Sequence, residues 1–200
     1  GQDKLDKVKD MTMTSKISIA GLPAEANGTT RMKRPNLFYQ EISVAGMGTL
    51  NKSTYDGKVG KVSGMQGSKT VTGEELEEFK KQGEFFAETQ YAKNGYELKL
   101  ESISMVDGEK AYEMIVTDPS GEKFTEYYSV ESGLKIKEEA TQEGPQGPMT
   151  SSTTYSDYRE VNGVMIPFTQ VVIAGPQKII PTVYDVGPGP LPLAEGSPKD

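Results

Sequence analysis

The sequence contains no cysteine, no histidine and no tryptophan among its 200 residues. Without cysteine the chain can form neither disulfide bonds nor thiolate metal sites, and without histidine it lacks the commonest metal ligand and the commonest general base. A serine or threonine nucleophile would have no imidazole to activate it. We therefore expect no catalytic residue, no metal site and no cofactor, and we predict that the chain is not an enzyme.

Basic charge and long apolar runs are also scarce. The formal net charge of −7 argues against a nucleic-acid partner, because a surface that binds nucleic acid needs basic residues to neutralise phosphates. No apolar stretch approaches the roughly 20 residues that span a bilayer as a helix, so we expect no transmembrane segment. If the protein is exported, we expect its signal peptide to lie outside this sequence.

Strand patterns separated by turn residues fill most of the chain. Residues alternate in character over 38–44, and strands predicted over 96–106 and 110–117 end on Asp-Gly and Asp-Pro-Ser-Gly turns. Over 61–71 the pattern predicts one short strand and a loop. Turns recur about every 10 residues, which is typical of an antiparallel sheet wrapped on itself. We predict a mainly β (α+β) fold with one strongly curved antiparallel sheet that forms an incomplete barrel.

Residues 72–81 change to the periodicity of a helix. Thr72 stands three residues before Glu75, acidic side chains fill the first turn and lysines the last, which indicates a capped helix whose charges match its dipole. Its apolar side, with Leu76 and Phe79, is expected to lie against the sheet as a lid. The polar start of the chain fits the last turns of a second helix.

The chain length suits one domain with a continuous core. We predict that this domain spans residues 1–186 and that residues 187–200 form an irregular tail. The tail reads GPGPLPLAEGSPKD, and its prolines and glycines leave few backbone donors and no periodicity for a helix or strand.

Three short motifs resemble the bacterial lipoprotein-localisation carrier family, which comprises a periplasmic chaperone and its outer-membrane receptor. The motifs are LDKV at 5–8, KRPNLF at 33–38 and DGK at 56–58. The resemblance implies an incomplete antiparallel barrel of about eleven strands closed on one side by helices, a cavity for lipoprotein acyl chains, and a location in the periplasm or cell envelope. It also implies that Arg34 matches an arginine that tethers the lid.

Candidate ligand-binding or lid-tethering residues follow from this reading. Methionine thioethers adapt to irregular apolar ligands, although the same residues also fill cores, and we favour packing. Tyrosines on the predicted strands present the same choice between a stacking platform and packing, and again we favour packing. The glutamates of the predicted helix fan around its axis and indicate a solvated face rather than a metal site. The candidate residues are Arg34, Phe38, Met47, Met65, Leu76 and Phe79.

The later part of the chain carries a second resemblance. The stretches EKFTEYY at 122–128, YSDYREVNGV at 155–164 and IPF at 166–168 look like the non-catalytic C-terminal domain of bacterial insulinase/pitrilysin-type zinc peptidases. The peptidase signature needs two histidines and a glutamate on one helix, so any zinc-peptidase activity would belong to a longer parent protein.

Two functional hypotheses result. The first is a non-catalytic cell-envelope binding domain that holds a lipid, an acylated polypeptide or another apolar segment in the half-barrel cavity. The alternative is an accessory domain that contacts the neighbouring domains of a longer peptidase-like protein and carries no ligand.

Overall fold

The computed structural model describes residues 2–22, 24–65, 67–144 and 147–187. Within these ranges the chain forms one antiparallel sheet of thirteen strands, two α-helices and one short 3₁₀-helix. The helices are α1 (Gln2–Lys7), α2 (Glu74–Gln82) and η1 (Ala87–Gln90). The first six strands are β1 (Asp10–Ile19), β2 (Ala26–Lys33), β3 (Leu37–Val44), β4 (Gly48–Tyr55), β5 (Gly60–Gly64) and β6 (Gly67–Val71). The other seven are β7 (Glu97–Val106), β8 (Glu109–Thr117), β9 (Lys123–Ser129), β10 (Lys135–Gly144), β11 (Gly147–Val161), β12 (Val164–Ala174) and β13 (Gln177–Gly187).

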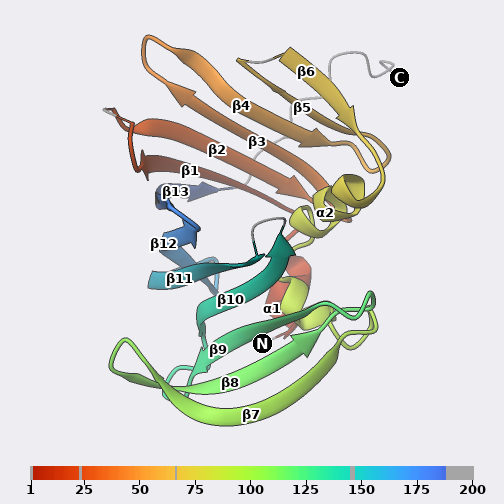
Figure 1. The fold of residues 1–200 in the computed structure, drawn as a ribbon, viewed down its shortest axis with the longest axis vertical. Coiled ribbons are helices and arrows are strands. Elements are labelled where there is room, and N and C mark those ends of the chain that lie inside the picture. The colour runs from red at the N-terminus through yellow and green to blue at the C-terminus, as the bar shows by residue number, and fades with distance from the viewer. Residues whose placement is uncertain (1, 23, 66, 145–146, 188–200) are drawn as a thin grey trace.

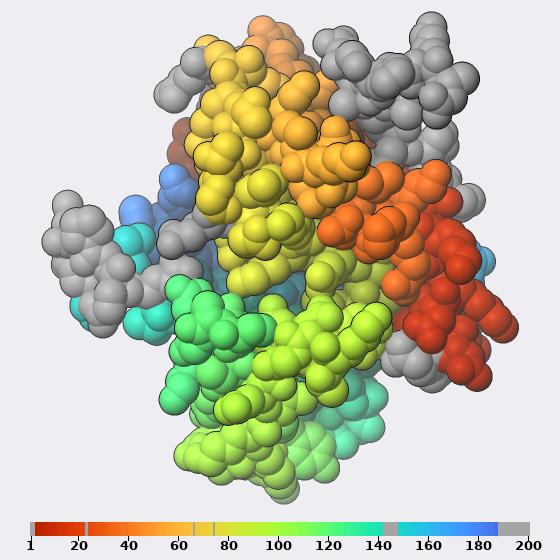
Figure 2. Space-filling view, turned by 90° about the vertical axis from the view of Figure 1, so that its right-hand side faces the viewer, coloured from red at the N-terminus to blue at the C-terminus, as the bar shows by residue number. Residues whose placement is uncertain are grey.

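The path of the chain explains why helices cover one side of the sheet. The strand order is β6-β5-β4-β3-β2-β1-β13-β12-β11-β10-β9-β8-β7. The first six strands run outward from the middle to one edge, and β7 to β13 return from the opposite edge to the middle, where β1 pairs with β13. The connecting segment 72–96 must therefore cross between the edges, and with α2 and η1 it covers the concave side (Figures 1 and 2).

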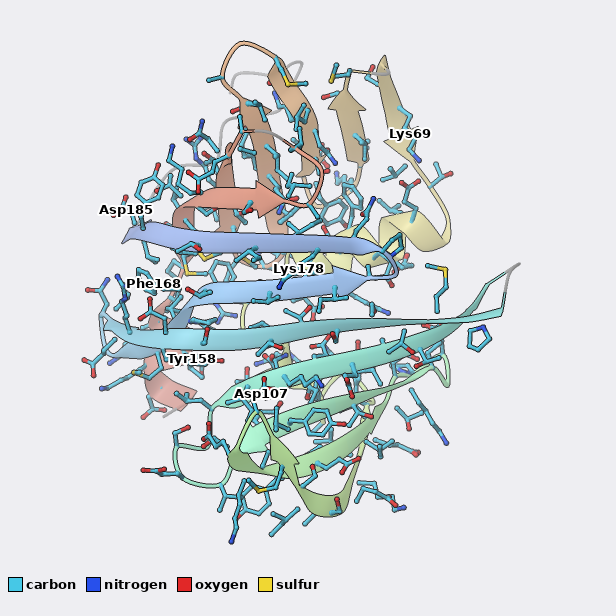
Figure 3. The ribbon with its side chains drawn as sticks, turned by 60° about the vertical axis from the view of Figure 1, so that its left-hand side comes forward. Lys69, Asp107, Tyr158, Phe168, Lys178 and Asp185 are labelled. Atoms are coloured by element: carbon cyan, nitrogen blue, oxygen red, sulfur yellow. The ribbon has the colours of Figure 1, made fainter. Side chains whose placement is uncertain are left out.

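The sheet curls because its ladders are interrupted by bulges. Register shifts interrupt the pairings β1–β13, β3–β4, β7–β8 and β9–β10, with the extra residue in β13, β4, β7 and β10. Each such bulge bends its strand and increases the twist. Strands β10 to β13 lie in the middle of the sheet and connect strands β1 to β6 with strands β7 to β9 (Figure 3). The outermost strands, β6 and β7, do not pair with each other. The sheet is thus an open, curled half-barrel, which confirms the predicted fold class.

Helix α2 lies close to its predicted position, but its N-terminus differs. Its N-cap is Gly73, with no side-chain cap hydrogen bond, so the predicted capping by Thr72 is wrong. The helix begins one position too late for the Thr72 hydroxyl to occupy the cap position. At the other end, a Cβ atom on Gly83 would stand 2.1 Å from the carbonyl oxygen of Asn36. Glycine is needed there because α2 ends against the turn between β2 and β3.

Two apolar clusters join the helices to the sheet. The α2 cluster consists of Phe38, Tyr55, Val71 and Phe79, with Met32, Val62 and Leu76 packed around them. The α1 cluster consists of Val164, Ile166, Phe168 and Val183, with Leu5, Val8, Met11, Met13, Phe86, Val161 and Val186 around them. Each cluster buries the apolar side of one helix, which is what holds short helices in place in a folded protein.

Two other parts of the chain differ from their predicted structure or fall outside the description. The expectation of one strand and a loop over 61–71 is wrong, because β5 and β6 form a hairpin there. Strand β13 continues to Gly187, one residue into the predicted tail. The rest of that tail, 188–200, lies outside the described residues, and the predicted domain limit at residue 186 stays a prediction.

Candidate ligand-binding site

A pocket of about 310 Å³ opens beside α1. Its walls come from α1, the start of β1, the turn between β11 and β12, the end of β13 and Phe86. The apolar lining residues are Val8, Met11, Phe86, Val161, Val164, Ile166 and Val186, and all of them belong to the α1 cluster. The pocket is therefore a hollow within an apolar cluster, which is the usual character of a small-molecule site.

Arg34 fixes the α1 wall of this pocket. Its Nε atom donates a hydrogen bond to the carbonyl oxygen of Val8 at 2.8 Å, and Nη2 donates to that of Leu5 at 3.1 Å. Its backbone amide donates to the carbonyl oxygen of Lys9 at 2.9 Å, and the guanidinium lies 5.4 Å from the centre of the buried Phe85 ring. The carbonyls of Leu5, in α1, and of Val8, just after it, thus receive charge-assisted donors.

Phe86 forms another wall from an uncommon backbone conformation. Its φ of 50° and ψ of 55° lie in the left-handed region, which bulky residues rarely adopt. The Thr89 amide and hydroxyl both donate to the Phe86 carbonyl oxygen, at 2.9 and 2.8 Å. These bonds hold the turn that places the Phe86 ring in the α1 cluster, and strain of this kind is often found at binding sites.

Polar residues lie among the same lining residues. They include three lysines and one aspartate. The lysines are exposed and belong to α1 and the residues that follow it. The polar lining residues are Lys4, Lys7, Lys9, Asp10 and Asn162. A Cβ atom on Gly163 would come within 3.0 Å of Lys4 Nζ, so the Lys4 side chain lies over the turn between β11 and β12.

The six residues predicted from the sequence lie in three different places. Phe38, Leu76 and Phe79 pack together in the α2 cluster, where Phe38 and Phe79 are 6.5 Å apart, edge to face. Met47 and Met65 are exposed, at 51% and 68%. The sixth, Arg34, contacts the backbone beside the pocket. None of the six is among the lining residues of the pocket, and their part in ligand binding stays a prediction.

A buried ionic network holds η1 and the residues after it against strands β9 and β10. It consists of Glu88, Tyr91, Glu126, Tyr128, Lys135 and Glu138, and we call it the Glu126 network. Glu126 is only 1% exposed and accepts hydrogen bonds from Tyr91 at 2.9 Å, Tyr128 at 2.7 Å and Lys135 at 3.0 Å. Lys135 also pairs with Glu138 at 3.0 Å and with Glu88 of η1. Every carboxylate in the network has a partner, which burial of charge requires.

The network changes the acidity of its members. Burial, reinforced by the Glu126 carboxylate, raises the pKa of Tyr91 and Tyr128 well above the usual tyrosine value. Burial alone would lower the pKa of Lys135, but Glu88, Tyr155 and Glu126 outweigh it and raise this pKa above the usual lysine value. Lys135 is therefore a fixed positive charge that also lies 5.2 Å from the Tyr155 ring centre.

A row of exposed apolar side chains runs along the edge strand β7. Its members are Leu98, Leu100, Ile103 and Met105, each between 52% and 62% exposed. Leu100 pairs with Met114, which pairs with Glu126, and directly paired residues share a face of the sheet. The β7 row therefore lies on the concave face, on the same side as the Glu126 network.

The sequence carried partial signals for the residues that prediction missed. In the stretch 124–128, the alternation of a strand places Glu126 on the same face as Phe124 and Tyr128. The sequence therefore indicated a carboxylate that lies between two aromatic side chains on one face of the sheet. The pocket gave no local signal, because its walls come from parts of the chain that lie far apart in sequence.

Two further searches of the described residues gave negative results. No group of three or more acidic side chains among them is arranged to hold a metal ion. Neither α-helix in the described ranges has the length and apolar content of a bilayer-spanning helix.

Comparison with known proteins places this fold. No protein-family model and no curated protein sequence matches the chain. A solved DUF1329 family protein from Desulfovibrio piger superposes with a TM-score of 0.67 at 13% identity, over 93% of this chain and 88% of its own. A LolA superfamily protein from Nitrosomonas europaea gives 0.61 at 12% identity, over 95% and 92%. A domain described as an outer membrane lipoprotein-sorting protein from Vibrio parahaemolyticus gives 0.61 at 9%, over 93% and 88%.

These likenesses define the class of fold to which the chain belongs. It has the open half-barrel fold of these solved proteins, which is the fold that the resemblance over 5–8, 33–38 and 56–58 implied. At such low identity the likeness concerns the fold alone, and the function must be argued from the site.

Proposed function

We propose that the protein is a non-catalytic binding domain of the cell envelope that holds the alkyl chain of a lipid or acylated polypeptide in the pocket beside α1. The observation that carries this proposal is the apolar hollow of about 310 Å³ whose wall is fixed by Arg34. Lipoprotein sorting, which the name of one neighbour of the same fold mentions, supports an acyl ligand and an envelope location.

The size of the pocket narrows the ligand. A volume of about 310 Å³ lies at the lower end of the range of about 300–1,000 Å³ for ligand pockets. It suits one alkyl chain rather than several, and burial of that chain supplies the binding free energy at about 25 cal/mol per Å². In the α2 cluster, by contrast, Phe38 and Phe79 pack edge to face against each other between the helix and the sheet.

The proposal is tested by displacement of a fluorescent fatty-acyl probe and by mass spectrometry of lipid extracted from the purified protein. A Val161→Trp variant fills the pocket and is expected to weaken probe binding at least tenfold. The matched control is Val130→Trp, at a position that is partly exposed and outside the pocket. Thermal melts of both variants separate loss of binding from loss of folding.

Two outcomes would overturn the proposal. One is an absence of binding of any acyl probe to the unaltered chain. The other is full binding by Val161→Trp together with loss of binding when Leu100→Lys and Ile103→Lys are introduced on the β7 row. That second result would place the ligand on the exposed edge strand instead of beside α1.

Arg34 is proposed as the tether that keeps α1 over the pocket. An Arg34→Gln variant removes charge-assisted donors from the carbonyls of Leu5 and Val8 and is expected to cost about 1–3 kcal/mol. Faster hydrogen exchange at the amides of residues 5–9 would show release of α1. If exchange there is unchanged while stability falls, Arg34 supports the fold through Phe85 and is not a tether.

The accessory-domain alternative stays a prediction. It requires a neighbouring domain on the same polypeptide, and the reading frame of the gene upstream of residue 1 would show whether one exists.

A further inference from the structure

The charged side chains that line the pocket indicate the charge of the ligand that would bind there. The chain as a whole is acidic, with 29 acidic and 22 basic residues. Among the lining residues the balance is the opposite, with Lys4, Lys7 and Lys9 against the carboxylate of Asp10, while Asp3 and Asp6 of α1 are not among the lining residues. A cationic rim beside an apolar hollow matches an amphiphile whose head is anionic.

The positions of the lysines fit a rim around the opening of the pocket. Lys4 and Lys7 stand three residues apart on α1, so they are neighbours on one face of the helix. Lys9 follows α1 immediately, and its carbonyl accepts a hydrogen bond from the Arg34 amide at 2.9 Å. Lys4 reaches over the turn at Gly163 on the opposite wall. The backbone under the rim is therefore fixed, while the three lysine residues are exposed.

We propose that the pocket binds a single-chain amphiphile with an anionic head, whose chain enters the hollow while Lys4, Lys7 and Lys9 contact the head. This inference rests on the proposed function and adds the chemistry of the head group. Lysine acts as a compact point charge, whereas arginine offers a fork that matches carboxylate or phosphate geometry. The lining contains lysines and no arginine, so the pocket selects for negative charge and accepts either a carboxylate or a phosphate.

The test compares four probes with the same twelve-carbon chain on the full chain, by calorimetric titration below the micellar concentration. The probes are dodecanoate, dodecyl phosphate, neutral dodecanoylglycerol and cationic dodecyltrimethylammonium, at a mildly alkaline pH where the carboxylic acid is ionised. Both anionic probes are expected to bind about tenfold more tightly than the neutral probe. The difference should shrink at high salt, because exposed charges are screened.

Matched variants assign the effect to the rim. The triple variant Lys4→Gln, Lys7→Gln, Lys9→Gln should bind all four probes with similar affinity. Its control is Lys58→Gln, Lys93→Gln, Lys110→Gln, which makes the same change in net charge at three exposed lysines outside the pocket. The control is expected to keep the preference for anionic heads.

Each outcome decides between the two levels of the proposal. Equal binding of all four probes, or equal loss of preference in both triple variants, overturns the head-group inference and leaves the alkyl pocket standing. Absence of binding by every probe overturns the proposed function itself. A preference that depends on the rim lysines supports the inference, and the stronger of the two anionic probes shows whether the natural head is a carboxylate, as in a fatty acid, or a phosphate, as in a single-chain lysophospholipid.

Discussion

The two halves of the concave face are covered in different ways. Over β3 to β6 the roof is α2, which is held by aromatic and aliphatic packing around Phe38 and Phe79. Over β9 and β10 the roof is η1 and the residues after it, which are held by Glu126, Lys135 and the tyrosine hydroxyl of Tyr91. One half of the lid is fixed by apolar burial and the other by buried charge.

This difference predicts different sensitivities. Apolar burial involves no charged group, so its free energy scarcely depends on pH or on the screening of charges by salt. A buried ionic network depends on every partner, because removal of one leaves an uncompensated charge in a poorly solvated place. The half roofed by η1 should therefore respond to charge and pH, and the half roofed by α2 should respond to side-chain volume.

The largest expected effect comes from Phe79→Ala. The ring is buried against Phe38, Tyr55 and Val71, and its removal leaves a cavity that costs about 3–5 kcal/mol of unfolding free energy. Urea unfolding followed by circular dichroism measures the loss, which should be the same at low and high salt. Phe79→Leu, which keeps most of the volume, should cost less than about 1.5 kcal/mol. A loss below 1 kcal/mol for the alanine variant would contradict apolar fixing of α2.

Lys135→Met should cost slightly less, about 3 kcal/mol. The substitution keeps the aliphatic volume but leaves Glu126 buried without its cation. Adding Glu126→Leu to the same chain should recover most of the stability, because a well-packed apolar pair can replace a buried ion pair. If the double variant is less stable than Lys135→Met alone, Glu126 is held by its tyrosine hydrogen bonds and not by Lys135.

The sequence was informative to different degrees about the two halves. Helical periodicity over 72–81 identified α2, and the contact of Leu76 and Phe79 with the sheet followed from one face of that helix. The Glu126 network could not be predicted from a periodic pattern in this way. Glu126 and Lys135 come from adjacent strands, and Glu88 comes from a turn of 3₁₀-helix with no periodic pattern. The register of β9 and β10 brings Glu126 and Lys135 together, and the ion pair between Lys135 and Glu88 depends on where η1 lies.

The pocket was the least predictable feature. A hollow forms where side chains from several strands fail to meet, and its volume depends on the curl of the sheet, which arises from bulges rather than from composition. The sequence left methionines either as cavity lining or as core packing, with packing favoured, and Met11 has both roles, because it lines the pocket and packs against the α1 cluster. For Met47 and Met65 the loops carry the side chains into solvent.

Alkaline pH should weaken the half roofed by η1. Folding raises the pKa of Tyr91 above the ordinary value of 10.0, so this group contributes its full stability below pH 10 and loses it as the pH rises further. Each such tyrosine can remove up to about 1.4 kcal/mol per pH unit above that point. Urea unfolding at a series of alkaline pH values should give a shallower decline for Tyr91→Phe than for the unaltered chain. Parallel declines would show that the Tyr91 hydroxyl is not coupled to folding.

The smallest effect concerns the link between the two halves. Lys81, at the end of α2, lies 3.2 Å from Asp118 in the turn between β8 and β9. Burial alone would raise the pKa of Asp118, but hydrogen bonds from Ser120, Lys81 and the Glu122 amide lower it to about 2. Asp118 therefore contributes stability above its ordinary value of 3.8 and loses it as the pH falls toward 2.

Lys81→Gln should remove only the part of this contribution that depends on the link. Because Lys81 is 43% exposed, the cost at neutral pH is expected to stay below about 1 kcal/mol, and the acid transition should begin at a higher pH. Lys80→Gln, which removes an exposed pair with Glu77 on the same helix, is the matched control. If both variants shift the acid transition equally, the effect comes from the charge of α2, and the two halves of the lid are coupled only through the sheet.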